Sequence, residues 1–219
     1  MHPILRLYED ILSGDASDVR LPALPRMVFV VHGAVTIDGR VVRDGEAWHG
    51  EAAAALAPAG EGACCWRFEL APAEAASGAA AGRGVSSRLK LSAALDTLPE
   101  GDLLLRGDSV AFPPGGCAYL HRHQGPGIRC LIEGGIRIDT HGRSTSYGPG
   151  GAWYETGPDP VFAQAAADRP SRFIRAMILP RALIGKSSIQ YVNEEDKAKP
   201  RSQSYKIFAD APIALPAAG

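Results

Sequence analysis

The chain has 219 residues, with 23 basic and 24 acidic side chains, and its formal net charge is −1. Its apolar fraction of 46% and charged fraction of 21% are ordinary for a globular protein. No basic stripe or arginine-rich run is present, so the sequence argues against a nucleic-acid partner, and no run of about 18 apolar residues could span a membrane. The four cysteines lack regular spacing and the first residues lack a signal-peptide core, which favours a reduced, cytoplasmic protein.

The first residues favour a helix. Their apolar side chains recur at helical spacing and the pattern ends at a Ser-Gly pair: Leu5, Tyr8, Ile11 and Leu12, then Ser13-Gly14. We therefore expect residues 1–26 to form a short amphipathic helix and a lead-in to the main body.

From residue 27 the chain consists of short apolar runs separated by turns that contain glycine or proline. MVFVVHGAVTI, DLLLRGDSVAF and RFIRAMILP are typical of strands, and many short strands at this spacing indicate an antiparallel sandwich or barrel. The segment 71–84, rich in alanine and glycine, is expected to be a flexible loop. The polar tail, 183–219, is expected to wrap the body or a neighbouring subunit.

An internal repeat indicates two copies of one β-unit. VVHGAVTIDGRVVRDGEAWHGE, starting at Val30, aligns with LIEGGIRIDTHGRSTSYGPGGAWYET, starting at Leu131. The matched positions include Gly33 with Gly134, Ile37-Asp38 with Ile138-Asp139, and Ala47-Trp48 with Ala152-Trp153. Histidines precede only the second copy, so only that copy could carry a histidine site.

PPGGCAYLHRHQGPGIRCLIEGG, followed by YGPGGAWYETGPDPV, resembles the cupin superfamily of jelly-roll β-barrels. The residues that match the two cupin motifs are Gly115 or Gly116, His121, His123 and Gly134 in the first, and Pro149-Gly150 in the second. The resemblance implies an all-β fold of tandem cupin-type jelly-roll (double-stranded β-helix) barrels. Residues 27–88 would be a degenerate, cupin-like half without metal ligands, and residues 89–182 the cupin domain that carries the site.

The sequence departs from the cupin motifs at two ligand positions. Gly127 stands where the first motif has glutamate, and Val161 stands near the position of the second motif's histidine. Two of the usual four ligands are therefore missing, which puts a standard centre of three histidines and one glutamate in doubt.

His121 and His123 point to the same face if they lie in a strand, because side chains two residues apart share a face. Two neutral imidazoles at that spacing can chelate one divalent ion, which we leave open among Fe, Mn, Ni and Zn. Glu155 is the expected third ligand and would complete a facial triad; Gln124 is a weaker candidate. The alternative is that both histidines only hydrogen-bond to polar groups in a metal-free barrel.

Arg129 is expected to face inward, and a buried arginine needs an anionic partner. That partner is either Glu155 or a substrate carboxylate bound bidentately, and pairing with Arg129 would make Glu155 less available to a metal. Tyr119 is expected on the histidine face as a donor of a hydrogen bond or a proton. Trp153 is expected mainly as a core residue and, with Gln124, as a candidate substrate contact.

The sequence leaves three functions open. The first, implied by the family resemblance, is a dioxygenase-like, metal-dependent enzyme that acts on a small, possibly anionic metabolite. The second is a metal-dependent isomerase or lyase that uses the ion as a Lewis acid. The third is a non-catalytic barrel that binds or senses a small molecule. A homodimer is expected, because cupin-like barrels often associate through exposed sheet edges.

Overall fold

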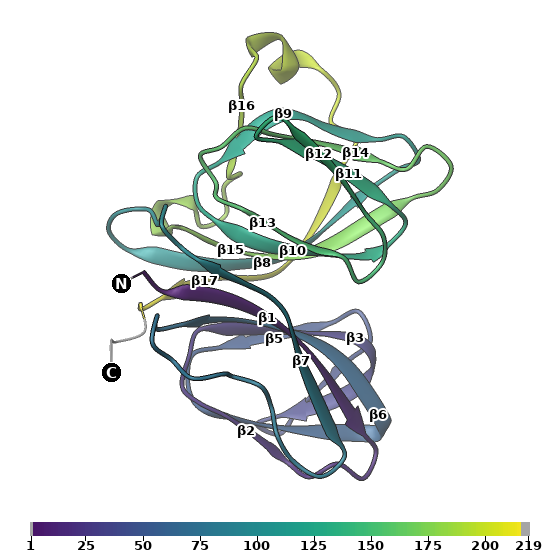
Figure 1. Ribbon diagram of the computed structural model, residues 1–219, viewed down its shortest axis with the longest axis vertical. Coiled ribbons are helices and arrows are strands. Elements are labelled where there is room, and N and C mark those ends of the chain that lie inside the picture. The colour runs from purple at the N-terminus through teal and green to yellow at the C-terminus, as the bar shows by residue number, and fades with distance from the viewer. Residues whose placement is uncertain (1, 216–219) are drawn as a thin grey trace. The chain divides into compact units, whose positions relative to one another are not determined.

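The structure is a computed structural model that describes residues 2–215. These residues divide into two compact units, one built from the residues up to Leu95 together with those from Ile213 on, and the other from Asp96–Pro212. Both units consist of β-strands (Figure 1), and the helical elements among the described residues are two short 3-10 turns, η1 (Arg181–Leu183) and η2 (Glu194–Ala198). No helix in residues 2–215 has the length and apolar character needed to cross a membrane. The predicted all-β class is confirmed.

The first unit is one strongly curved sheet. Its strands run in the order β4-β3-β6-β1-β7, with β2 paired to β6 and β5 paired to β3. The strand bounds are β1 (Ile4–Ser13), β2 (Val19–Leu21), β3 (Arg26–Ile37), β4 (Arg40–Arg43), β5 (Ala47–Gly50), β6 (Ala54–Ala71) and β7 (Val85–Ala94).

The predicted N-terminal helix is wrong, because Ile4–Ser13 is strand β1. It pairs with β6 on one side and β7 on the other, so neighbouring strands satisfy its backbone. Leu5 and Leu7 on one face and Tyr8 and Leu12 on the other are all at most 2% exposed. A strand buried on both faces loses the usual alternation of apolar and polar residues, and the spacing that remained in this segment resembled that of a helix.

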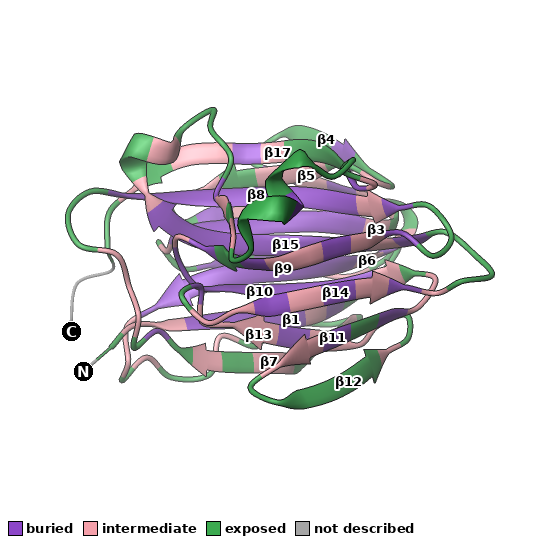
Figure 2. Cartoon of the chain, turned by 90° about the horizontal axis from the view of Figure 1, so that it is seen from above, coloured by how far each residue is buried: buried purple, intermediate pink, exposed green. Residues whose placement is uncertain are grey.

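The second unit contains two facing sheets. One has the order β13-β10-β15-β8-β17 and the other β12-β11-β14-β9-β16, and they enclose an apolar core (Figures 1 and 2). The bounds are β8 (Leu103–Phe112), β9 (Cys117–His123), β10 (Gly127–Glu133), β11 (Ile136–Thr140), β12 (Arg143–Tyr147), β13 (Ala152–Glu155), β14 (Val161–Ala165), β15 (Ser171–Pro180), β16 (Ile189–Tyr191) and β17 (Ser204–Ile213).

The C-terminal segment completes the second unit. Strand β16 extends one sheet beside β9, and β17 extends the other beside β8. The segment therefore wraps its own barrel. The unit begins at Asp96, later than the expected boundary at residue 89, because β7 pairs with β1 of the first unit.

Two glycines show that the repeat seen in the sequence is a structural duplication. Gly33 in β3 and Gly134 after β10 have φ angles of 81° and 83°. A Cβ at either position would overlap a backbone carbonyl oxygen, that of Gly62 or of Pro170. Only glycine tolerates both the left-handed backbone and this close approach, so each unit requires it at the same bend.

Candidate metal and ligand site

Strand β9 carries His121 and His123 into the interior of the second barrel. Each residue is 4% exposed, and their Nε2 atoms lie 3.2 Å apart. The prediction that the two side chains project side by side is thus consistent with the geometry.

A bulge in β9 changes which residues accompany the histidines. His121 pairs with Val161 and Ala118 pairs with Ala163, so two residues of β9 oppose a single residue of β14. The extra residue resets the alternation of the strand. Ala118 therefore faces the interior with the histidines. Tyr119, expected on that face, lies outside it with its ring 4.8 Å from the Nζ of Lys199.

Hydrogen bonds fix the tautomer of His121. Its Nδ1 lies 2.7 Å from the carbonyl oxygen of Tyr119. A carbonyl only accepts, so Nδ1 carries the proton and Nε2 presents a lone pair to the interior. Nδ1 of His123 lies 3.2 Å from the hydroxyl of Ser188, which can donate or accept.

Burial keeps both imidazoles neutral. Desolvation lowers the pKa of His121, opposed in part by the negative charge of Glu155. Desolvation, together with the neighbouring His121 and Arg129, lowers the pKa of His123 well below its ordinary value. Neutral imidazole is the form that binds metal ions.

Arg129 and Glu155 form a buried ion pair across β10 and β13. Nη2 of Arg129 lies 2.7 Å from Oε2 of Glu155, although the N–H is not aligned with this oxygen and Oε2 accepts no hydrogen bond. The same oxygen is 3.6 Å from Nε2 of His123. Arg129 also donates to the carbonyl oxygen of Gly127 at 2.6 Å, and burial lowers its pKa to about 10.

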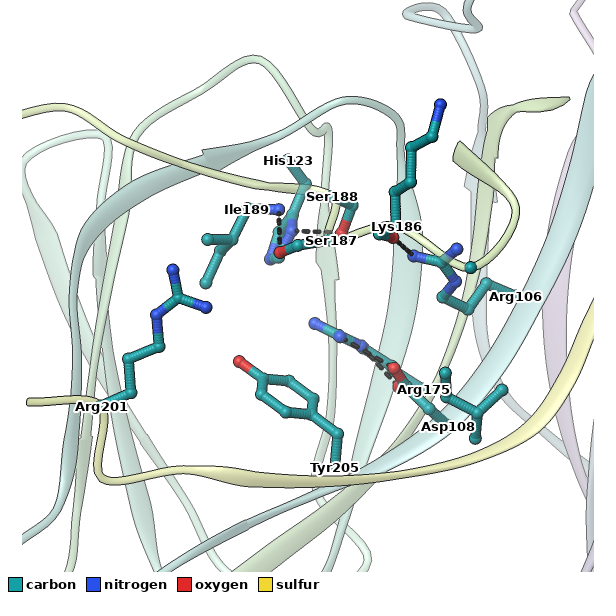
Figure 3. A pocket seen from close by; sticks show the side chains of 12 residues that line it. Arg106, Asp108, His123, Arg175, Lys186, Ser187, Ser188, Ile189, Arg201 and Tyr205 are labelled. Carbon is teal, nitrogen blue, oxygen red and sulfur yellow. Dashed lines mark hydrogen bonds and ion pairs between the residues drawn. The ribbon is translucent and has the colours of Figure 1, made fainter. Parts of the chain in front are cut away.

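Two neighbouring spaces adjoin these residues. A void of about 20 Å³ inside the barrel is lined by His121, His123, Arg129 and Glu155 among others; we call it the barrel void. A larger space of about 230 Å³, the ligand cavity, lies between β8, β15 and the C-terminal segment (Figure 3). His123 and Arg175 line both spaces. The barrel void has room for one ion or water, and the ligand cavity has room for a small molecule.

Apart from His123, sequence reasoning missed the residues that form the ligand cavity. Arg175 in β15 is buried and bound bidentately by Asp108 in β8, with N–O distances of 2.6 and 2.9 Å. Burial alone would lower the pKa of Arg175, but Asp108 raises it. The C-terminal segment adds Ser188, Arg201 and Tyr205. The sequence did indicate Arg175, since this residue interrupts the apolar run RFIRAMILP. It gave no indication for the C-terminal segment, because the position of that segment depends on pairing with β8 and β9.

The remaining predicted residues occupy different places. Trp153 packs in the core at 4% exposure, and its Nε1 donates to Oε1 of Glu155 at 2.9 Å. Gln124 follows the last residue of β9 and lines neither of the two spaces. Val161 is a core residue, and a Cβ at Gly127 would overlap the backbone of Ala176. At both positions where the cupin motifs have a metal ligand, this chain therefore has a residue that packs against its neighbours.

The two histidines have the spacing of metal ligands, whereas a third ligand is not in place. In this structure the two Nε2 atoms share a hydrogen bond of 3.2 Å. Two nitrogens each about 2.0–2.1 Å from one ion in tetrahedral or octahedral geometry lie about 2.9–3.4 Å apart, so an ion could replace the shared proton without moving the rings far. Within residues 2–215, no three side chains of His, Cys, Asp or Glu are grouped as a metal site. The two histidine nitrogens fit an ion, and the carboxylate of Glu155, which would be the third ligand, is paired with Arg129 instead.

The first barrel lacks the same residues at equivalent positions. Val28 pairs with Trp48 as Arg129 pairs with Trp153, so valine replaces the arginine. Leu21 pairs with Ala54, two residues before Leu56, which is the partner of Ile37. In the second barrel His121 pairs with Val161, two residues before Ala163, which is the partner of Ile138. Leucine therefore replaces the first histidine.

No protein-family model and no curated protein sequence matches the chain, whereas solved structures do. The formate complex of oxalate decarboxylase from Lactobacillus farciminis matches with a TM-score of 0.60 at 11% identity, over 91% of this chain and 82% of that one. Oxalate decarboxylase from Bacillus subtilis at pH 4.6 matches with a TM-score of 0.58 at 12% identity, over 87% and 69%.

Oxalate decarboxylases are bicupins. This chain has the same duplicated β-barrel fold, so the fold that the resemblance of the HRH segment implied is confirmed. At this level of identity the likeness extends to the fold alone.

Proposed function

We propose that this protein is a metal-dependent cupin enzyme that acts on a small anionic metabolite. The observation that carries the proposal is the pair of buried, neutral imidazoles, whose Nε2 atoms lie 3.2 Å apart beside the barrel void of about 20 Å³. When bound there, a divalent ion such as Fe, Mn, Ni or Zn would supply redox or Lewis-acid chemistry.

The chain's own residues would hold the ion and the substrate in adjoining spaces. His121 and His123 supply the nitrogens, and Glu155 supplies a carboxylate once Arg129 releases it. A substrate in the ligand cavity reaches His123, which lines both spaces. Arg175 also lines both spaces, so a substrate anion in the ligand cavity would lie next to the ion without contacting Arg129, which lines only the barrel void.

The experiment is a calorimetric titration of chelator-treated protein with Mn²⁺, Ni²⁺, Zn²⁺ and, without oxygen, Fe²⁺. We expect one ion per chain, lost in His121→Ala/His123→Ala and retained in His141→Ala, whose side chain is 59% exposed near Asp159. Uptake that is equal in the double variant would contradict the proposal. Preference for iron with oxygen-dependent turnover would favour an oxygenase over an isomerase or lyase.

A second candidate function is a non-catalytic barrel that binds a small molecule. The observation that favours it is the 2.7 Å ion pair, which holds Glu155 on Arg129 rather than on the histidines. Absence of metal uptake, with the ligand cavity still binding an anion, would select this function.

A further inference from the structure

The ligand cavity has an outer wall that only the C-terminal segment supplies. Arg106 ties this wall together, because it donates to the carbonyl oxygens of Leu183 and Lys186 at 2.6 and 2.7 Å and to Asp210 at 2.9 Å. The hydroxyl of Ser202 fastens the same segment to the backbone of Cys117 at the start of β9. The wall is therefore a built part of the barrel, and Arg106 is a positioning residue for it.

Three polar groups converge in this cavity from opposite sides. Figure 3 shows the guanidinium of Arg201 and the hydroxyl of Tyr205 directed towards the space that the guanidinium of Arg175 faces from the barrel side. Asp108 binds Nε and Nη2 of Arg175. Among the described residues, none accepts a hydrogen bond from its Nη1.

The charges around the cavity leave one unpaired cation. Asp108 neutralises Arg175 and Asp210 neutralises Arg106. Lys186 turns its Nζ away from the cavity (Figure 3). Arg201 has no acidic partner among residues 2–215 and contacts the ring of Tyr191 at 5.7 Å. The cavity is thus matched to an anion with a single negative charge.

The shape and the apolar lining narrow the ligand further. A planar guanidinium fork binds a carboxylate with two parallel hydrogen bonds, and the hydroxyl of Tyr205 can donate to the same group. Ile189 and Ile207 line the remaining wall, and about 230 Å³ is below the usual range for drug-sized ligands. Such a site suits a carboxylate with a short apolar body.

We infer that Arg201, Tyr205 and Nη1 of Arg175 form a binding site for a small organic monocarboxylate, with the C-terminal segment supplying its specificity. The inference deepens the proposed function by naming the substrate class of the same site. It rests on that function only in treating the bound monocarboxylate as a substrate. Binding itself needs no metal, because none of the three groups is a candidate metal ligand.

The test is calorimetry with butanoate and with inorganic phosphate on the full chain. We expect saturable binding of one butanoate, preferred over phosphate because phosphate carries more charge than one cation balances. Arg201→Met should weaken butanoate binding about tenfold or more, and Tyr205→Phe about two- to tenfold. Arg122→Met removes an exposed arginine of β9 that lines neither space, and it should change nothing.

His121→Ala separates this inference from the proposed function. His121 lines the barrel void and not the ligand cavity, so the variant should lose metal uptake and keep butanoate binding. Unaltered butanoate binding in Arg201→Met, tighter binding of phosphate, or no saturable binding of butanoate by the unmodified chain would each overturn the inference. Arg201 is exposed, so its replacement should leave the melting temperature unchanged.

Discussion

Replacing Arg129 tests the relation between the buried ion pair and the metal site. At an effective dielectric constant of about 20, unit charges at the observed 2.7 Å attract each other by about 6 kcal/mol, and desolvation offsets part of this. Arg129→Met would leave Glu155, 11% exposed, without its cation. Breaking a buried pair from one side costs about 3–5 kcal/mol, so we expect a loss of that size in the free energy of unfolding of the metal-free protein.

The assay is urea unfolding of Arg129→Met, Glu155→Gln and the double variant, each with and without a divalent ion. The double variant should cost less than the sum of the single variants by at least about 1 kcal/mol, because the two residues are in contact. If Glu155 is a ligand that Arg129 restrains, the ion should stabilise Arg129→Met more than the unmodified protein. Strict additivity, or equal stabilisation of both proteins by the ion, would refute the reasoning.

Four further predictions concern both barrels. Arg67→Met in the first barrel breaks a fully buried pair with Asp10 and should lower the free energy of unfolding by about 3–5 kcal/mol without changing butanoate binding. Gly134→Ala should destabilise more than Gly39→Ala, measured by urea unfolding: both have positive φ, worth about 1–2 kcal/mol, but only Gly134 lacks space for a Cβ. Metal-free protein should lose stability as the pH falls below about 6.5. Burial lowers the pKa of His121 and His123 in the folded protein, so the unfolded chain binds more protons in this range. In urea unfolding, the stability of His121→Gln/His123→Gln should not show this dependence on pH. Light scattering should give a mass about twice 23.1 kDa, that of the expected homodimer, and a mass of one chain would contradict this expectation.

Short apolar runs separated by turns, together with the repeat, predicted most of the fold. Gly33 and Gly134 aligned in the sequence because each unit needs a left-handed residue at the same close approach. Strand β1 escaped prediction because both of its faces are buried. Leu5 and Leu7 lie on one face and Tyr8 and Leu12 on the other, so apolar residues occur at both odd and even positions. Local spacing alone does not separate such a strand from a helix.

The candidate site was predicted only where its residues lie close together in the sequence. His121, His123, Arg129 and Glu155 lie within 35 residues of one another and meet in the barrel void. The position of Tyr119 depended on a bulge, which shifts a side chain to the other face without a sequence signal.

The ligand cavity could not be predicted because its parts are distant in the chain. Asp108, Arg175 and Arg201 come from β8, β15 and the C-terminal segment. Asp108 and Arg175 meet because β8 pairs with β15, and Arg201 joins them because β16 lies beside β9 and β17 beside β8. No local pattern encodes those pairings.

The most direct test of the central claim is elemental analysis of the protein purified without added metal and without a histidine tag. We predict close to one Fe, Mn, Ni or Zn per chain in the unmodified protein and almost none in His121→Ala/His123→Ala. A metal content that is negligible in the unmodified protein, or the same in both proteins, would contradict the claim that the two histidines hold a catalytic ion.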